Sequence, residues 1–269
     1  MMSSRATVKS TQMSKDDATG RPEQSGEINR FPRVTLTAPS ASGFLLLLAE
    51  VDRRPWWLVP ASHVKSSLLK RLKTLCAGIA SSANIASTVV FRAFLAAPRG
   101  HSAYLARRHA PAHRARFDVV VLIEAASPER IGEIRQSAKF VALEQVLHSA
   151  ARYTETIVAR NVKRIGPVDH TRDGVFLFNY FVAGTQERNL AVWEYTAGWF
   201  EQETGLDNST VLLPLDPAAT TYSLINHCRW DRLRDVLPSL VFKRSFRNYV
   251  LTHFDENDTA PMPILYPLA

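Results

Sequence analysis

The segment from Gly174 to Trp230 places a strand, a helix and two further strands in direct succession. Its aromatic run GVFLFNYFVAG is typical of a strand, and QERNLAVWEYTAGWFEQETG predicts a helix that ends at a glycine. The runs DNSTVLLPLDP and TTYSLINHCRW predict two more strands. Connections this short put consecutive elements side by side, and the order is that of the first part of a ferredoxin-like unit.

A broken helix and a last strand complete this unit. Pro238 separates the helical runs DRLRDVL and SLVFKRSFRNYV, and a proline removes a helical hydrogen bond, so we expect the helix to break there. MPILYPLA supplies a short final strand. The second half is therefore predicted to run strand, helix, strand, strand, helix, strand.

The first half repeats this order. Its strands are expected at Phe44–Val51, Ala86–Ala97, Phe117–Ala125 and Arg152–Val162, and its helices at Val64–Ala77 and Ser127–Leu147. This gives a disordered tail at 1–40, a first ferredoxin-like repeat at 41–165 with a basic loop at 99–116, and a second repeat at 173–269.

Both faces of the aromatic strand in the second half are apolar. Phe176, Phe178 and Tyr180 point one way, and Val175, Leu177 and Phe181 point the other. Helices cover one face of a ferredoxin-like sheet, so the second face needs another cover, which the sheet of the other repeat can supply. The predicted fold class is α+β, with tandem ferredoxin-like repeats that form a dimeric-type α+β barrel within one chain.

Composition and missing motifs narrow the function. The apolar run FLLLLAEV is too short to span a bilayer, and we expect a cytoplasmic protein with two buried thiols, Cys76 and Cys228. No glycine-rich phosphate loop, GxSxG elbow, HExxH or CxxC occurs, which disfavours nucleotide hydrolysis, serine hydrolysis and zinc chemistry. No metal site is predicted.

The net charge of +8 is concentrated in the basic loop, where five arginines have no acidic neighbour. Such a cluster can contact phosphate or another anionic surface. A nucleic-acid partner ranks last, however, because no aromatic residues for base stacking are interleaved with this charge.

The second half resembles the antibiotic biosynthesis monooxygenase-like domains of the dimeric α+β-barrel superfamily. The resemblance rests on FLFNYFVA, LAVWEYTAGWFEQETGL and INHCRWDRLRDVL, and the first half follows by element order. It implies a pocket between the sheet and its helices. It also implies that Asn179, on the first strand, orients a substrate or an oxygen intermediate, as in cofactor-independent oxygenases of aromatic polyketides.

Six residues are candidates for the site. Asn179 and His227 lie on strands that are neighbours in a ferredoxin-like sheet, so we expect both to face one cavity, Asn179 as an orienting amide and His227 as a general base. For substrate binding we name Tyr195 and Trp199, which share a helix face at i, i+4, together with Trp230 and the linker residue His170. A purely structural role is the alternative for each of them.

Two functions remain open from the sequence. The first is a cofactor-independent monooxygenase acting on an aromatic or polyketide-like substrate, since carbanion chemistry requires only a base and an enclosed site. The second is a non-catalytic ligand-binding or assembly module of the same fold. The expected partner is a small hydrophobic or aromatic ligand, with a homo-oligomer also compatible. No cofactor is predicted, although His227 could serve as an axial ligand of haem.

Overall fold

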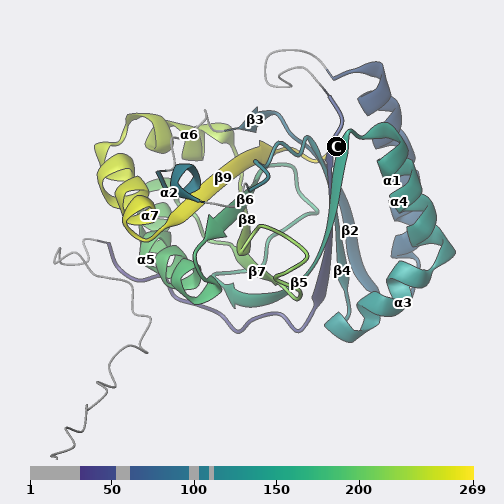
Figure 1. The fold of residues 1–269 in the computed structure, drawn as a ribbon, viewed down its shortest axis with the longest axis horizontal. Coiled ribbons are helices and arrows are strands. Elements are labelled where there is room, and N and C mark those ends of the chain that lie inside the picture. Colours follow the sequence, from purple (N-terminus) through teal and green to yellow (C-terminus); the bar gives the residue numbers. More distant parts are fainter. Residues whose placement is uncertain (1–30, 53–60, 97–102, 109–111) are drawn as a thin grey trace, which may run out of the picture.

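The computed structural model describes residues 31–52, 61–96, 103–108 and 112–269. Helices form two outer layers on either side of a strongly curled sheet (Figure 1). Residues 1–30 of the expected tail, and parts of the expected basic loop, lie outside the described residues.

The first repeat has the predicted order of elements. Its sheet order is β2-β4-β1-β5, with the first and third long strands, β1 and β4, adjacent at the centre. The strands are β1 (Gly43–Glu50), β2 (Ile85–Arg92), β4 (Val119–Ala125) and β5 (Tyr153–Arg164), and the helices are α1 (His63–Ala80), α3 (Ile131–Gln136) and α4 (Ala138–Ala150), with a 3-10 turn at Pro128–Arg130.

The second repeat has the equivalent order, β7-β8-β6-β9. Its strands are β6 (Val175–Ala183), β7 (Thr210–Pro214), β8 (Leu224–Trp230) and β9 (Thr259–Tyr266), and its helices are α5 (Gln186–Thr204), α6 (Leu233–Phe242), a π-helical stretch (Phe246–Leu251) and α7 (Thr252–Glu256). Helix α5 ends at Gly205 in the left-handed conformation, φ 66°, as the sequence predicts.

The predicted helix break at Pro238 is wrong. Pro238 lies inside α6, and the helix continues to Phe242 before Lys243 adopts an extended conformation. Only one intrahelical hydrogen bond depends on the missing N–H of a proline. The surrounding helix therefore tolerates the residue, and the interruption falls five positions later.

Pairing between β5 and β7 joins the two repeats into one nine-stranded sheet. At the far edges, the short strand β3 (Leu95–Ala96) pairs with β9, and Phe91 of β2 forms a bridge with Leu268. The Ala269 N–H also donates to the Val90 carbonyl at 2.9 Å. These contacts connect the two edges and produce the predicted intrachain α+β barrel.

Three apolar clusters follow from this architecture. One fills the barrel interior and includes Phe91, Phe178 and Tyr180. One lies between the first half-sheet and its helices, where β1 contributes only apolar residues, Leu45, Leu47 and Ala49. The third lies between the second half-sheet and its helices. As predicted, both faces of β6 are buried.

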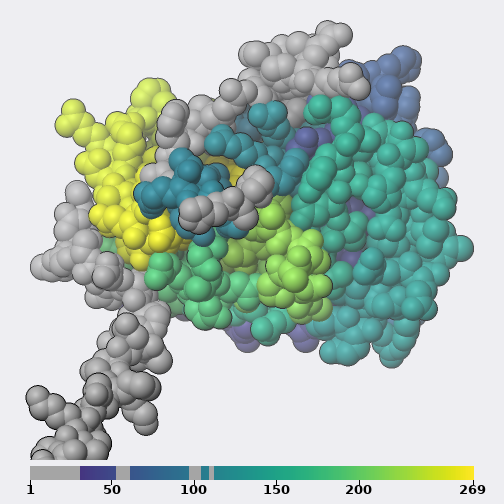
Figure 2. Space-filling model, in the orientation of Figure 1, coloured from purple at the N-terminus to yellow at the C-terminus, as the bar shows by residue number. Residues whose placement is uncertain are grey.

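The described part of the basic loop packs against the second half. Helix α2 (Ala103–Arg107) lies on the surface beside the C-terminal region (Figure 2). Arg107 forms an ion pair with Asp258 at 2.9 Å, and Arg188 of α5 approaches the same carboxylate at 3.5 Å. Part of the positive charge of this loop is therefore balanced by an acidic residue of the second repeat.

In residues 31–40, expected in the tail, Phe31 and Val34 are instead buried against the second half, and Thr37 forms a bridge with Arg164 of β5. Phe31 is 4% exposed, and its ring meets that of Tyr249 edge to face. The Thr37 N–H donates to the Arg164 carbonyl at 2.8 Å. Gly198 of α5 lies under this segment, where an added Cβ would come within 1.9 Å of the Pro32 carbonyl oxygen. Residues 31–34 therefore pack against α5 and hold it in place.

This contact predicts opposite effects for two glycine substitutions. Gly198→Ala is expected to lower the free energy of unfolding by about 1–3 kcal/mol despite the better helix propensity of alanine, because the Cβ has no space. Gly78→Ala in α1, where nothing lies within 4 Å of the added Cβ, is expected to raise it by about 0.5–1 kcal/mol. Urea unfolding measures both, and a stabilising Gly198→Ala would contradict the packing of residues 31–34.

Candidate functional site

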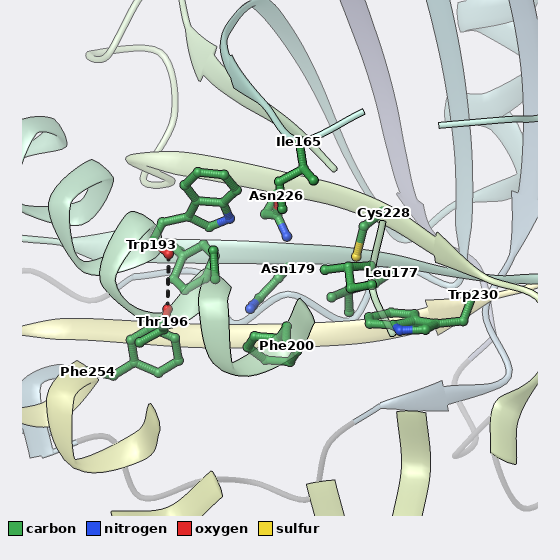
Figure 3. A pocket seen from close by; sticks show the side chains of 13 residues that line it. Ile165, Leu177, Asn179, Trp193, Thr196, Phe200, Asn226, Cys228, Trp230 and Phe254 are labelled. Atoms are coloured by element: carbon green, nitrogen blue, oxygen red, sulfur yellow. Dashed lines mark hydrogen bonds between the residues drawn. The ribbon is translucent and has the colours of Figure 1, made fainter. Parts of the chain in front are cut away.

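A pocket lies between the second half-sheet and helices α5 and α7 (Figure 3). Its cavity volume is about 30 Å³, within about 380 Å³ of space free of protein atoms that includes open solvent. Strands β6 and β8 form its floor, and α5 forms one wall. The described lining residues are Ile165, Leu177, Asn179, Phe181, Trp193, Thr196, Ala197, Phe200, Leu206, Asn226, Cys228, Trp230 and Phe254.

Two asparagine side chains form the polar centre of the floor. Asn179 of β6 and Asn226 of β8 are paired directly across the antiparallel ladder, so their side chains project to the same face. Each residue is 7% exposed. The Asn226 Oδ1 accepts a 2.6 Å hydrogen bond from the Ser209 hydroxyl, whereas the buried Asn179 Oδ1 has no partner. An unsatisfied buried acceptor is costly, and such groups occur at functional sites.

Aromatic rings surround these amides. Trp193, Phe200, Trp230, Phe181 and Phe254 provide most of the apolar wall. The Trp230 indole N–H donates to the Thr204 hydroxyl at 3.0 Å, so this ring offers the pocket only its apolar surface. Planar aromatic rings pack well against such walls.

Among the described lining residues, only Cys228 carries an ionisable side chain. Burial raises the pKa of its thiol well above the ordinary value, so the thiol stays protonated at neutral pH. The lining therefore supplies hydrogen-bonding amides and no general base.

The expectation that Asn179 and His227 face one cavity is wrong. The strands β6 and β8 are neighbours, as predicted, but Asn179 is paired with Asn226, and His227 is paired with Phe178. Adjacent residues of a strand point to opposite faces, so His227 projects into the barrel interior while Asn179 projects into the pocket. His227 cannot act as the base for a ligand beside Asn179.

His227 and His170 form a buried pair at one end of the barrel interior. The His227 Nδ1–H donates to the Leu177 carbonyl at 2.9 Å, because a carbonyl can only accept. The neutral His227 Nε2 therefore accepts the Nε2–H of His170 at 2.8 Å. Their rings stack between Phe176 and Phe178. His170 thus fastens the linker between the repeats to the barrel rather than lining the pocket.

Both imidazoles have pKa values below the ordinary value. Burial lowers the pKa of His170 to about 4, with an opposing effect from Asp169 and a supporting one from Arg229. Burial, followed by the proximity of His170, places the pKa of His227 well below its usual value. Both residues are therefore neutral at physiological pH.

Of the four proposed substrate-binding residues, only Trp230 lines the pocket. Tyr195 stacks on His253 at 3.9 Å and on Tyr249 at 4.9 Å, away from the lining. Trp199 is fully buried, and its indole N–H donates to the Ser245 hydroxyl at 3.0 Å. Together with His170, these residues pack the structure outside the pocket.

Sequence reasoning missed Asn226 and one face of α5. The lining residues Trp193, Thr196, Ala197 and Phe200 follow the spacing i, i+3, i+4, i+7, which marks a single helix face. That spacing is visible in the sequence. The spacing of Tyr195 and Trp199 marks a different face, which turns away from the sheet.

The described residues do not favour a metal or haem site. They contain no group of three or more His, Cys, Asp or Glu side chains arranged to hold a metal ion. His227, the residue considered for haem, is 2% exposed and uses both ring nitrogens in hydrogen bonds within the barrel. An axial ligand needs a free ring nitrogen and space for the porphyrin, and His227 has neither.

Within the described part of the chain, no helix combines the length and apolar character needed to cross a membrane.

Solved structures with the same fold are similar to this chain over most of its length. An anthrone oxidase-like protein matches with a TM-score of 0.60 and 12% identity, over 86% of this chain and 92% of its own. A candidate monooxygenase from Fusobacterium nucleatum subsp. nucleatum matches with a TM-score of 0.53 and 8% identity, over 85% of this chain and 93% of its own.

A mutant chlorite dismutase from Candidatus Nitrospira defluvii is more remote, with a TM-score of 0.43 and 11% identity over 87% of this chain and 94% of its own. Neither a protein-family model nor a curated protein matches the sequence. The first two similarities confirm the class of protein: a dimeric-type α+β barrel, here built from one chain.

The buried histidines predict acid sensitivity. Below about pH 6.5 an unfolded histidine gains a proton, whereas folded His170 stays neutral down to about pH 4. The unfolded state then binds more protons, so the free energy of unfolding falls as the pH falls through this window. His170→Gln keeps an N–H donor for His227. It is expected to reduce the slope of the free energy of unfolding against pH by up to about 1.4 kcal/mol per pH unit.

Urea unfolding between pH 7.5 and pH 4.5 measures this slope. His63→Gln, which replaces an exposed histidine in the first turn of α1, is the matched control and is expected to follow the wild type. A His170→Gln slope equal to that of the wild type would mean that this imidazole is not neutral in the folded state.

Proposed function

We propose that the protein is a cofactor-independent oxygenase that uses O₂ to oxidise a small, planar aromatic compound bearing a carbonyl or phenolic oxygen. The main support is the Asn179–Asn226 pair, two buried amides at the centre of an aromatic pocket, one with an unused oxygen. The fold shared with an anthrone oxidase-like protein and a candidate monooxygenase supports the same chemistry.

Anthrone illustrates the reaction. Its carbonyl acidifies the opposite ring methylene, so loss of one methylene proton gives a delocalised enolate. The enolate gives electrons to O₂, and a carbon–oxygen bond forms at the former methylene carbon. Loss of the second hydrogen and cleavage of the oxygen–oxygen bond release water and leave a new carbonyl. Anthrone and O₂ thus give anthraquinone and water, with O₂ as the oxidant.

The pocket would assist this reaction by binding and enclosing the substrate. The amides of Asn179 and Asn226 can donate to a substrate oxygen. The aromatic walls hold the ring system and keep water from the reactive carbon. Because the described lining lacks a base, the substrate must lose its first proton to solvent before it is enclosed, which restricts the substrates to compounds with an acidic C–H or a phenolic O–H group.

The missing base favours one alternative, a pocket that binds such compounds without turning them over. Binding with no consumption of O₂ would identify this function. For either function we place the protein in the cytoplasm, because both cysteines are buried and unpaired, as suits a reducing compartment.

Oxygen uptake with anthrone tests the catalytic proposal. Asn179→Ala is expected to lower kcat/KM by about 10²-fold or more, in the range seen when a donor to a developing oxyanion is removed. Asn84→Ala removes the same amide from the loop before β2 of the first half, remote from the pocket, and is expected to leave kcat/KM unchanged. Oxidation at equal rates by the wild type and Asn179→Ala would overturn the assignment of this pocket.

A further inference from the structure

The hydrogen bond from Ser209 determines which end of the Asn226 amide faces the pocket. Ser209 is fully buried, and its Oγ lies 2.6 Å from the Asn226 Oδ1. No other partner of this hydroxyl is found among the described residues. If the Asn226 NH₂ pointed toward Ser209, the single hydroxyl proton would be buried without an acceptor, at a substantial cost. The amide oxygen therefore faces Ser209, and the NH₂ group faces the pocket.

A second donor, the indole N–H of Trp193, belongs to the same pocket lining. Figure 3 shows the indole nitrogen of Trp193 on the side of its ring nearer Asn226. An indole N–H can only donate, and no hydrogen bond satisfies this one within the described part of the chain. Trp193 is 5% exposed, so most of its ring is buried.

The other polar groups of the lining are not accessible as strong acceptors. The Asn179 Oδ1 is fully buried. The Thr196 hydroxyl proton is used by the Val192 carbonyl at 2.9 Å. No carboxylate occurs among the described lining residues. Donors that line a mainly apolar pocket without a negative charge stabilise an anionic oxygen more strongly than a neutral hydroxyl.

We propose that Ser209 is a positioning residue that orients Asn226 as a hydrogen-bond donor, so that Asn226 and Trp193 together select a ligand in its oxyanion form, a phenolate or an enolate. This inference rests on the proposed function and specifies the ionisation state of its substrate. Ser209 acts only through Asn226.

The phenol 4-nitrophenol is a direct probe, because it is small and its phenolate absorbs visible light. A site that prefers the phenolate lowers the pKa of the bound phenol, and each unit of lowering corresponds to a tenfold preference. For the wild type we expect the pKa of bound 4-nitrophenol to lie at least about one unit below that of the free compound. An unchanged or raised pKa, or no binding at millimolar concentration, would overturn the proposal.

Two variants test the role of Ser209. Ser209→Ala frees the Asn226 amide to rotate, and it is expected to weaken phenolate binding by about three- to tenfold while leaving binding of the neutral phenol nearly unchanged. Asn226→Asp still accepts from Ser209 but places a second acceptor toward the pocket, so it is expected to raise the pKa of the bound phenol above that of the free compound.

Ser87→Ala, a serine of β2 in the first half, is the matched control and is expected to titrate like the wild type. A Ser209→Ala protein that binds phenolate as well as the wild type would overturn the positioning role. The outcome is separate from that of the oxygen-uptake experiment. A lowered pKa without oxidation of anthrone would retain this inference and reject the oxygenase, whereas oxidation with no change in pKa would do the reverse.

Discussion

The pairing of β5 with β7 is the contact on which the rest of the structure depends. Each half-sheet has one face covered by its own helices and a second apolar face that must also leave water. Joining the halves along this ladder, from Ala159 opposite Pro214 to Arg164 opposite Thr210, lets the two second faces cover each other. The barrel core then contains a large cluster of buried aromatic rings, and the pocket lies on the outer, helix-covered side.

Strand register determines which polar residues reach that pocket. A shift of one residue between β6 and β8 would exchange the positions of Asn226 and His227 and place an imidazole beside Asn179. The observed register instead pairs two amides and buries the imidazole among aromatic rings with His170. The protein therefore offers the pocket amide groups that donate or accept hydrogen bonds, and, among the described lining residues, it offers no side chain that takes up a proton.

The fold could be predicted from the sequence because the patterns that indicate it are local and occur in both halves of the chain. Two-sided apolar strands and a doubled element order indicate a barrel, and FLFNYFVA places Asn179 on the correct strand. The site was only partly predictable, since no turn joins β6 to β8 and the sequence does not reveal the register that pairs Asn179 with Asn226 instead of His227. The burial of Phe31 and Val34 could not be predicted, because it depends on contacts with the second half that no local pattern encodes.

Connecting the two halves covalently also permits them to diverge. A barrel made of two identical subunits carries the same residues on both outer faces, and any change appears twice. Here the helix-facing side of β1 presents Leu45, Leu47 and Ala49 where β6 presents an asparagine between Leu177 and Phe181. The two helix-facing sides therefore differ, and the amide pair of the proposed site belongs to the second repeat.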